Sequence, residues 1–249
     1  MLWDFTKEKF DIIIQAGQSN AEGCGVGNVE KAYAPTDKIL HLDGDFTISV
    51  ARERIDENFI CSHFGLTFAK KYIEDGRLED GRRVLIIRSA VGGTGFSDHR
   101  WGMTDDLYLR MMELIRTALE LNPENRVVAM LWHQGETDAC NNMDEETYYN
   151  NLNRLIGTVR DMCGNTLPVI CGDFVQDWKS KNAEICAPII SAQRKLTAQI
   201  GNSAFVETDD LLSNNQFNGF TWDDIHFARG ELYVLGERYY EAFVKADKK

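Results

Sequence analysis

Three side chains that could together carry out acyl transfer stand far apart in the sequence. Ser19 lies in the stretch IIIQAGQSN, where three isoleucines lead to a glycine and then to a hydroxyl side chain. Asp223 and His226 lie three residues apart in WDDIH, near the other end of the chain. Acyl transfer needs an activated hydroxyl group, an imidazole that accepts its proton and a carboxylate that orients the imidazole. These residues therefore predict Ser19 as nucleophile, His226 as base and Asp223 as the orienting carboxylate.

Taken singly, each of these residues also has a purely structural explanation. The tetrapeptide SNAE fits a capping box, in which the side chains of Ser19 and Glu22 bind the first amides of a helix. Asp223 and His226 could be a turn aspartate and a surface histidine, because a D-x-x-H spacing is common by chance. The combination with the groups described next favours the catalytic interpretation.

Residues that could stabilise an oxyanion follow two other apolar runs. Gly92 and Gly93, in VGGT, lack side chains, so that a backbone amide there can approach a substrate closely. Gln134, in WHQGETD, can direct its carboxamide at the same spot, and the amide of Ser19 is a further donor. The sequence predicts an oxyanion hole from these groups and leaves open which glycine amide points inward.

The elements that must position these residues follow from hydrophobic periodicity. Short continuous apolar runs predict strands buried on both faces, at 11–17, 83–90, 127–135, 167–173 and, more weakly, 203–209. A helical apolar period predicts amphipathic helices at about 148–163, 62–75, 105–121, 184–200 and 230–246. Their alternation predicts an α/β fold with a parallel sheet between two helical layers. The loops that carry the candidate residues converge at the carboxyl edge of such a sheet.

Four motifs resemble those of the SGNH hydrolases, and more narrowly of their sialate O-acetylesterase-like and family 6 acetylxylan esterase-like branch. They are GQSN at 17–20, VGGT at 91–94, WHQGETD at 132–138 and DDIH at 223–226. The general superfamily has asparagine in its third motif, whereas Gln134 agrees with this carbohydrate-esterase branch. The resemblance implies a flavodoxin-like three-layer α/β/α sandwich with a central parallel sheet of about five strands. It also implies ester hydrolysis without a metal or another cofactor.

The orienting carboxylate has two candidates. Glu136 belongs to the third motif, and the resemblance implies that this glutamate can act alongside or instead of the aspartate. We favour Asp223, because a separation of three residues in a turn places it beside His226 locally. Glu136 depends on the tertiary fold to reach the same ring and could instead hold the loop of Gln134.

The expected substrate is a small acetylated carbohydrate, such as an acetylated xylo-oligosaccharide or sialic acid. Candidate substrate-binding residues are Gln18 and Asn20, beside the nucleophile, and Arg100 and Trp101 in a polar loop. An indole could stack on a sugar ring, and a guanidinium could bind the carboxylate of a sialic acid. A structural arginine and core packing of the indole are the alternatives.

Other residues could fill the same roles. Trp132 and Trp222 are further candidates for stacking, and Arg88 for binding a carboxylate. Two other functions stay open: an SGNH lipase or thioesterase that acts on short acyl chains, and a non-catalytic glycan-binding module of the same fold. Polar motif loops disfavour the first, and the intact set of catalytic side chains disfavours the second.

Composition limits the partners. The formal charge of −12 arises from 27 basic and 39 acidic side chains, with the basic ones scattered, so nucleic acid is not an expected partner. Six cysteines and five histidines show no ligand spacing, which predicts free thiols and no metal site. The early apolar run is too short for a signal peptide or a membrane span and predicts a cytoplasmic protein without a membrane partner. Residues 1–249 are expected to form a single domain, and the oligomeric state stays open.

Overall fold

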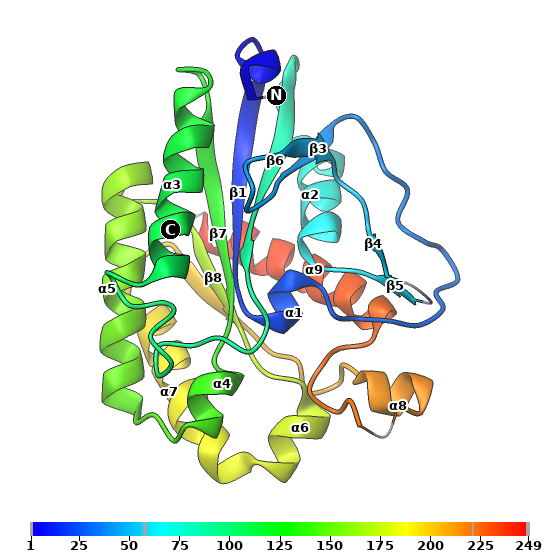
Figure 1. The fold of residues 1–249 in the computed structure, drawn as a ribbon, viewed down its shortest axis with the longest axis vertical. Helices are drawn as coiled ribbons and strands as arrows, with labels where there is room; N and C mark the ends of the chain where they lie inside the picture. The colour runs from blue at the N-terminus through cyan, green and yellow to red at the C-terminus, as the bar shows by residue number, and fades with distance from the viewer. Residues whose placement is uncertain (1, 57–58, 221, 248–249) are drawn as a thin grey trace.

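A mainly parallel sheet runs through the centre of the protein in the computed structural model, which describes residues 2–56, 59–220 and 222–247 (Figure 1). The strand order is β3-β2-β6-β1-β7-β8-β9, and only the β2–β3 pair is antiparallel. The strands are β1 (Lys9–Gly17), β2 (Ile39–Leu42), β3 (Ile48–Val50), β6 (Arg82–Ala90), β7 (Arg126–His133), β8 (Val169–Gly172) and β9 (Ser203–Val206). The predicted α/β class is confirmed. The predicted number of strands was too small, because short β2 and β3 extend one edge of the sheet.

Helices cover both faces of the sheet, as Figure 1 shows. On one face lie α3 (Asp106–Glu120), α5 (Glu145–Cys163) and α7 (Ala183–Gln199), and on the other α2 (Gly65–Glu74) and α9 (Arg229–Ala246). Each face has its own cluster of buried apolar side chains, so the molecule has three layers. These are the five helices that the apolar period predicted. Among the described residues, no helix combines the length and the apolar character needed to cross a bilayer.

Hydrophobic periodicity did not predict the shortest helices and strands. They are η1 (Leu2–Phe5), α1 (Ser19–Glu22), α4 (Glu136–Cys140), α6 (Gln176–Lys181), α8 (Asn214–Asn218) and the hairpin of β4 (Arg54–Asp56) and β5 (Phe59–Cys61). An element of three to six residues is too short to display an apolar period. Several of them nevertheless lie at the candidate site.

The central strand β1 explains where the candidate site forms. Ile12 and Ile14 are buried in one cluster and Ile13 in the other, as expected for a strand covered on both faces. The strand ends at Gly17, where φ is +135° and a Cβ atom would lie 2.0 Å from the carbonyl oxygen of His133. Only glycine permits this approach, which holds the exits of β1 and β7 against each other.

Candidate active site

Ser19 occupies the first residue of α1, directly after the exit of β1. The N-cap of this helix is Gln18, and no side chain caps it. The Glu22 carboxylate instead accepts a hydrogen bond from the Gly92 amide, at 2.7 Å. The capping-box interpretation of Ser19 and Glu22 is therefore wrong. Ser19 is largely buried, with 7% of its surface exposed.

Asp223 and His226 form a hydrogen-bonded pair. The His226 Nδ1 atom lies 2.7 Å from Oδ1 of Asp223, and the second carboxylate oxygen accepts a hydrogen bond from Asn214 Nδ2 at 2.7 Å. Burial by itself raises the pKa of Asp223, but the hydrogen bonds from His226 and Asn214 outweigh it and lower that pKa below its usual value. An ionised Asp223 fixes a proton on Nδ1, which leaves Nε2 of His226 as the nitrogen that can accept a proton.

Asn20 joins the helix of the nucleophile to the segment of the histidine. Its Nδ2 atom donates to the carbonyl oxygen of Ile225 at 3.1 Å, and its Oδ1 atom accepts from the amide of Phe227 at 3.1 Å. These two residues flank His226, while Asn20 follows Ser19. The side chain of Asn20 thus brings together two segments that are more than 200 residues apart. Because Asn20 is 0% exposed, the prediction that it contacts substrate is corrected: it joins the segments of Ser19 and His226.

Glu136, the second candidate carboxylate, is buried beside Asn20. Its Oε1 atom accepts a hydrogen bond from Asn20 Nδ2 at 3.0 Å, while Oε2 is buried without a partner among the described residues. Burial raises the pKa of Glu136 above its usual value, against the opposing effects of the Asn20 hydrogen bond and the nearby His226. Of the two candidate carboxylates, Asp223 is the one that contacts the His226 ring.

Gly92 lies against the nucleophile. A Cβ atom built on Gly92 would lie 3.5 Å from the Cβ of Ser19, whereas one on Gly93 would meet nothing within 4 Å. Gly93 has a φ of +68°, which allows the loop to turn away after Gly92. Of the two glycines, Gly92 is therefore the one that lies against Ser19, and its amide donates to the Glu22 carboxylate.

Gln134 is fully buried and its carboxamide is already engaged. The Nε2 atom lies 2.8 Å from Oδ2 of Asp138, 3.2 Å from the carbonyl oxygen of Thr94 and 3.3 Å from Oε1 of Gln18. The two N–H groups of a carboxamide are accounted for by these acceptors. In this structure the Gln134 side chain ties the exit of β7 to the loop that follows β6, and its donation to an oxyanion stays a prediction.

Gln18 also organises loops. It is 2% exposed, and its Oε1 atom accepts hydrogen bonds from the amides of Gly135 at 3.3 Å and Thr137 at 3.2 Å. The Gln18 carboxamide therefore links the start of α4 to the start of α1. The predicted contact of Gln18 with substrate is not compatible with this burial.

The other two predicted substrate-binding residues have structural partners as well. Arg100 forms a two-pronged ion pair with Asp106, at 2.8 and 3.0 Å. Trp101 is 1% exposed, donates from Nε1 to Thr94 Oγ1 at 3.0 Å and packs edge to face on Trp132. Trp101 therefore presents no ring face to a ligand, and the charge of Arg100 is compensated by Asp106.

Arg88 lines a cavity of about 190 Å³ beside the exit of β6. Its guanidinium pairs with Asp43 at 3.1 Å and donates to the carbonyl oxygen of Glu22 at 2.9 Å. Through these contacts, Arg88 stabilises the position of α1.

Asp138 and Asn214 contribute to the site and were not singled out from the sequence. Asp138 is buried and accepts hydrogen bonds from the amides of Phe96 at 3.1 Å and Ser97 at 2.7 Å, in the loop after Gly92. Asn214 holds Asp223. The third motif contains Asp138, so its position was a visible signal, but nothing in the local sequence connects Asn214 with a residue nine positions later.

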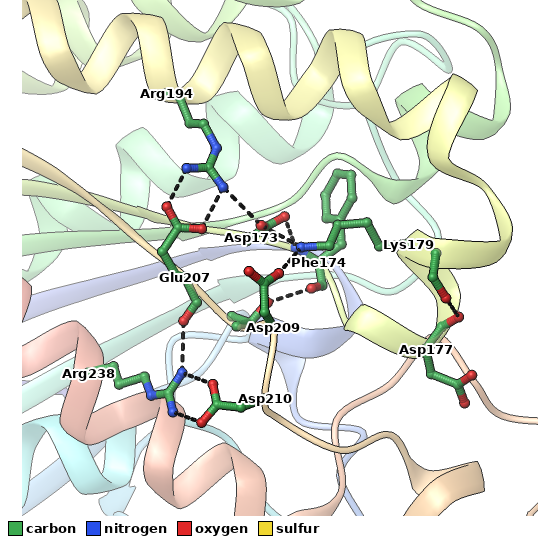
Figure 2. A network of polar contacts seen from close by, with 11 residues as sticks. Asp173, Phe174, Asp177, Lys179, Arg194, Glu207, Asp209, Asp210 and Arg238 are labelled. Carbon is green, nitrogen blue, oxygen red and sulfur yellow. Dashed lines mark hydrogen bonds and ion pairs between the residues drawn. The ribbon is translucent and has the colours of Figure 1, made fainter.

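Charged side chains form a network at the exits of β8 and β9 (Figure 2). Lys179 Nζ lies 2.8 Å from the buried carboxylate of Asp173 and 2.6 Å from Asp209. Arg194 extends from α7 to Asp173, at 3.4 Å, and to Glu207. Burial raises the pKa of Asp173, although Lys179 opposes the shift. The network fixes α6 against the edge of the sheet.

This fixed helix supports the turn that carries Asp223. Asp177, which Figure 2 shows near the network, accepts hydrogen bonds from Ser213 Oγ at 2.8 Å and Asn215 Nδ2 at 3.1 Å at the start of α8. Lys181 pairs with Asp224 at 2.9 Å, next to Asp223. The turn of Asp223 and His226 is thus held by α6 on one side and by Asn20 on the other.

Neither metal ligands nor disulfides contribute to the described part of the site. Within the described ranges, no group of three or more His, Cys, Asp or Glu side chains could hold a metal ion. The six cysteines are free thiols.

Comparisons with known proteins identify similar chains. A family model for carbohydrate esterases, described as sialic acid-specific acetylesterase, matches residues 9–245. A probable carbohydrate esterase of Arabidopsis thaliana is 33% identical over 181 residues. The match covers 64% of this chain and 66% of that protein. The chain therefore covers just under two thirds of the length of that relative.

Two solved structures are similar in fold. The crystal structure of NanS superposes with a TM-score of 0.80 at 19% identity, covering 96% of this chain and 98% of that chain. XAC1771, a carbohydrate acetylesterase from Xanthomonas citri, superposes with a TM-score of 0.64 at 17% identity, covering 96% and 56%. At these identities the likeness concerns the arrangement of strands and helices.

Proposed function

Since the chain belongs to the carbohydrate esterase, sialic acid-specific acetylesterase family, we propose that it removes O-acetyl groups from carbohydrates as a serine ester hydrolase. The proposal depends above all on one feature, the contacts that hold the His226 segment against α1. Asn20, next to Ser19, binds the residues on both sides of His226, whose ring is in turn oriented by Asp223 at 2.7 Å. A hydroxyl group, an imidazole and a carboxylate thereby belong to one connected unit.

In the first stage, the Ser19 oxygen attacks the carbonyl carbon of the acetyl ester while Nε2 of His226 accepts the hydroxyl proton. The carbonyl π electrons move to the oxygen and form a tetrahedral oxyanion. When the intermediate collapses, the bond to the sugar oxygen breaks, and His226 donates its proton to that oxygen. The sugar leaves as an alcohol, and Ser19 carries the acetyl group.

In the second stage, water attacks the acetyl carbonyl carbon, and His226 accepts the proton of the water. The new tetrahedral intermediate releases the Ser19 oxygen, which takes the proton back from His226. Acetate is the second product. The lowered pKa of Asp223 keeps this carboxylate ionised, so it stabilises the imidazolium in both stages.

The oxyanion donors in this proposal are the backbone amides of Ser19 and Gly92. Gly92 lies against Ser19, and its N–H group donates to a carboxylate oxygen of Glu22, at 2.7 Å. An ester oxyanion would take the place of that oxygen when the Glu22 side chain moves aside. Once Glu22 has moved aside, the two backbone donors are held in place by the fold and need no further reorganisation when the charge develops.

The substrate class follows from the family. Acetylated sialic acids and acetylated xylo-oligosaccharides are the candidates, and the family match gives no support to a lipid or thioester substrate. A cytoplasmic location and a single domain over 1–249 stay predictions.

Substitution of the nucleophile tests the proposal. We expect wild-type protein to release acetate from an acetylated sugar and Ser19→Ala to release none above the uncatalysed rate. Rapid quenching and mass spectrometry should reveal one acetyl group on Ser19 of the wild-type protein. Unchanged acetate release by Ser19→Ala would refute the mechanism, and no release by the wild-type protein from any sugar acetate would refute the function.

A further inference from the structure

Exposed apolar side chains gather beside the catalytic turn. Ten large apolar side chains are the most exposed among the described residues, and five of them come from the segments 55–60 and 217–222. They are Ile55, Phe59, Ile60, Phe217 and Trp222, with exposed fractions of 80, 45, 40, 46 and 76%. A single exposed apolar side chain needs no explanation, but a contiguous group marks a binding surface.

Three aromatic rings connect the two segments. Phe220 stacks on Trp222 with ring centroids 5.6 Å apart and planes 11° apart, and its ring meets the edge of Phe59 at 5.7 Å. Phe59 belongs to β5, whereas the other two rings follow α8. We call this group, Phe59, Phe220 and Trp222, the aromatic platform. The packing fixes the rings with one face of a tryptophan open to solvent, an arrangement with a low entropic cost for binding a flat ligand.

The aromatic platform is continuous with the catalytic residues. Trp222 directly precedes Asp223 in the chain, so their Cα atoms are about 3.8 Å apart. The hairpin that contributes Phe59 also reaches the other side of the site, because Arg54 in β4 lies 4.0 Å from Oε1 of Glu22. A ligand on the platform therefore lies next to the segment that orients the base.

A cavity of about 360 Å³ beside the platform shows what kind of ligand fits. Phe59 and Phe220 line it together with Asn28, Asn218 and Arg229. The guanidinium of Arg229 pairs with Glu53 at 2.6 and 2.8 Å, so its charge is already compensated. Aromatic faces beside amide groups suit a ligand with C–H faces and hydroxyl edges, and no uncompensated charge favours an anion.

We infer that the aromatic platform binds a neutral pyranose ring of the acetylated carbohydrate and so presents an attached acetyl ester to Ser19. The C–H face of the ring lies on Trp222, and its hydroxyl groups face the cavity. The identity of the ligand rests on the proposed function. The position of the platform does not, because it follows from the ring contacts and exposures alone.

The test compares a sugar ester with an ester that lacks a sugar. Trp222→Ala should lower the ratio of kcat/KM for an acetylated xylo-oligosaccharide to kcat/KM for para-nitrophenyl acetate by roughly five- to tenfold, the size of one aromatic contact. Phe59→Ala should lower it in the same direction. Leu109→Ala is the matched control, because Leu109 is 53% exposed on α3, and its ratio should equal that of the wild type. A ratio unchanged in Trp222→Ala and Phe59→Ala, or an equal loss on both esters, would overturn the inference.

A binding measurement separates this inference from the proposed function. Ser19→Ala protein is titrated calorimetrically with the same acetylated xylo-oligosaccharide, and the double variant with Trp222→Ala is expected to bind at least fivefold more weakly. This arm is informative even when the wild-type protein has no esterase activity. Equal affinity of the two proteins would overturn the inference. So would sedimentation data in which Trp222→Ala abolishes a wild-type dimer while sugar affinity is unchanged, because the platform would then bind a second copy.

Discussion

Replacement of Asp223 by asparagine separates the two carboxylates that could orient His226. The neighbouring amide of Asn214 donates to Oδ2 of Asp223, at 2.7 Å. An asparagine at 223 must turn its own carbonyl oxygen toward that donor, which places its NH₂ group against Nδ1 of His226. The imidazole then accepts at Nδ1 and carries its proton on Nε2. In this tautomer the ring cannot accept the proton of Ser19.

The magnitude follows from the role of such a carboxylate. Loss of the correct tautomer in a serine triad lowers kcat by about 10⁴, so we expect Asp223→Asn to lose about 10³ to 10⁴, or about 4 to 5.5 kcal/mol of transition-state stabilisation. Glu136→Gln keeps an acceptor for Asn20, which lies 3.0 Å from Oε1 of Glu136. We expect this control to lose less than about tenfold, since near-isosteric changes to a positioning group disturb geometry little.

Stopped-flow hydrolysis of para-nitrophenyl acetate between pH 6 and 9 measures both variants, and urea unfolding checks that each is folded. The burst of nitrophenol reports acylation of Ser19 directly. A folded Asp223→Asn that retains more than a tenth of the wild-type kcat, together with a thousandfold loss in Glu136→Gln, would show that Glu136 orients the base and that the assignment from the 2.7 Å contact is wrong.

Two further substitutions test the surroundings of the site. Asn20→Ala should lower kcat by about 10², since displacement of His226 by about 1 Å costs that much; stopped-flow kinetics measure it, and an unchanged kcat would contradict a positioning role. His133→Phe tests a buried imidazole whose pKa burial lowers to about 3. The unfolded chain binds this proton near pH 6.5 and the folded protein does not, so wild-type stability falls as the pH drops from 6.5 toward 3. Between pH 6 and 4, the free energy of unfolding measured in urea should fall by about 1.4 kcal/mol per pH unit less in the variant than in the wild type. Identical pH slopes for the two proteins would contradict this prediction.

The long elements of the fold could be predicted because their patterns extend over several periods. Strand β1 shows three consecutive isoleucines, and α5 shows apolar residues along one face for most of its length. Strand β2 has four residues, all of them buried. A run this short does not distinguish a strand from a loop in the sequence. The positions of short helices such as α8 depend on contacts with side chains of other segments, and the periodicity of the sequence does not reveal these contacts.

The chemistry of the candidate site could be predicted better than its contacts. The pairing of Asp223 with His226 follows from a local turn, and that contact is present. Gln18, Asn20 and Gln134 lie in motifs and carry polar groups, but all three are buried and bind other loops. The sequence shows that an amide is present, whereas its direction depends on which distant backbone groups remain unpaired. Trp222 was one of three candidate indoles, and the packing that leaves it exposed while it buries Trp101 and Trp132 is determined by the fold.

The position of β1 in the sheet has a consequence for biosynthesis. This first long strand pairs with β6 and β7, which are synthesised later. The hydrogen bonds of Asn20, in α1, form only after residues 225 and 227 have been synthesised. An emerging chain therefore carries the hydroxyl group of Ser19 long before it carries the proposed base, His226. On the proposed mechanism, activity therefore cannot precede the synthesis of residue 226, and a shorter nascent fragment has no imidazole at that position to activate Ser19.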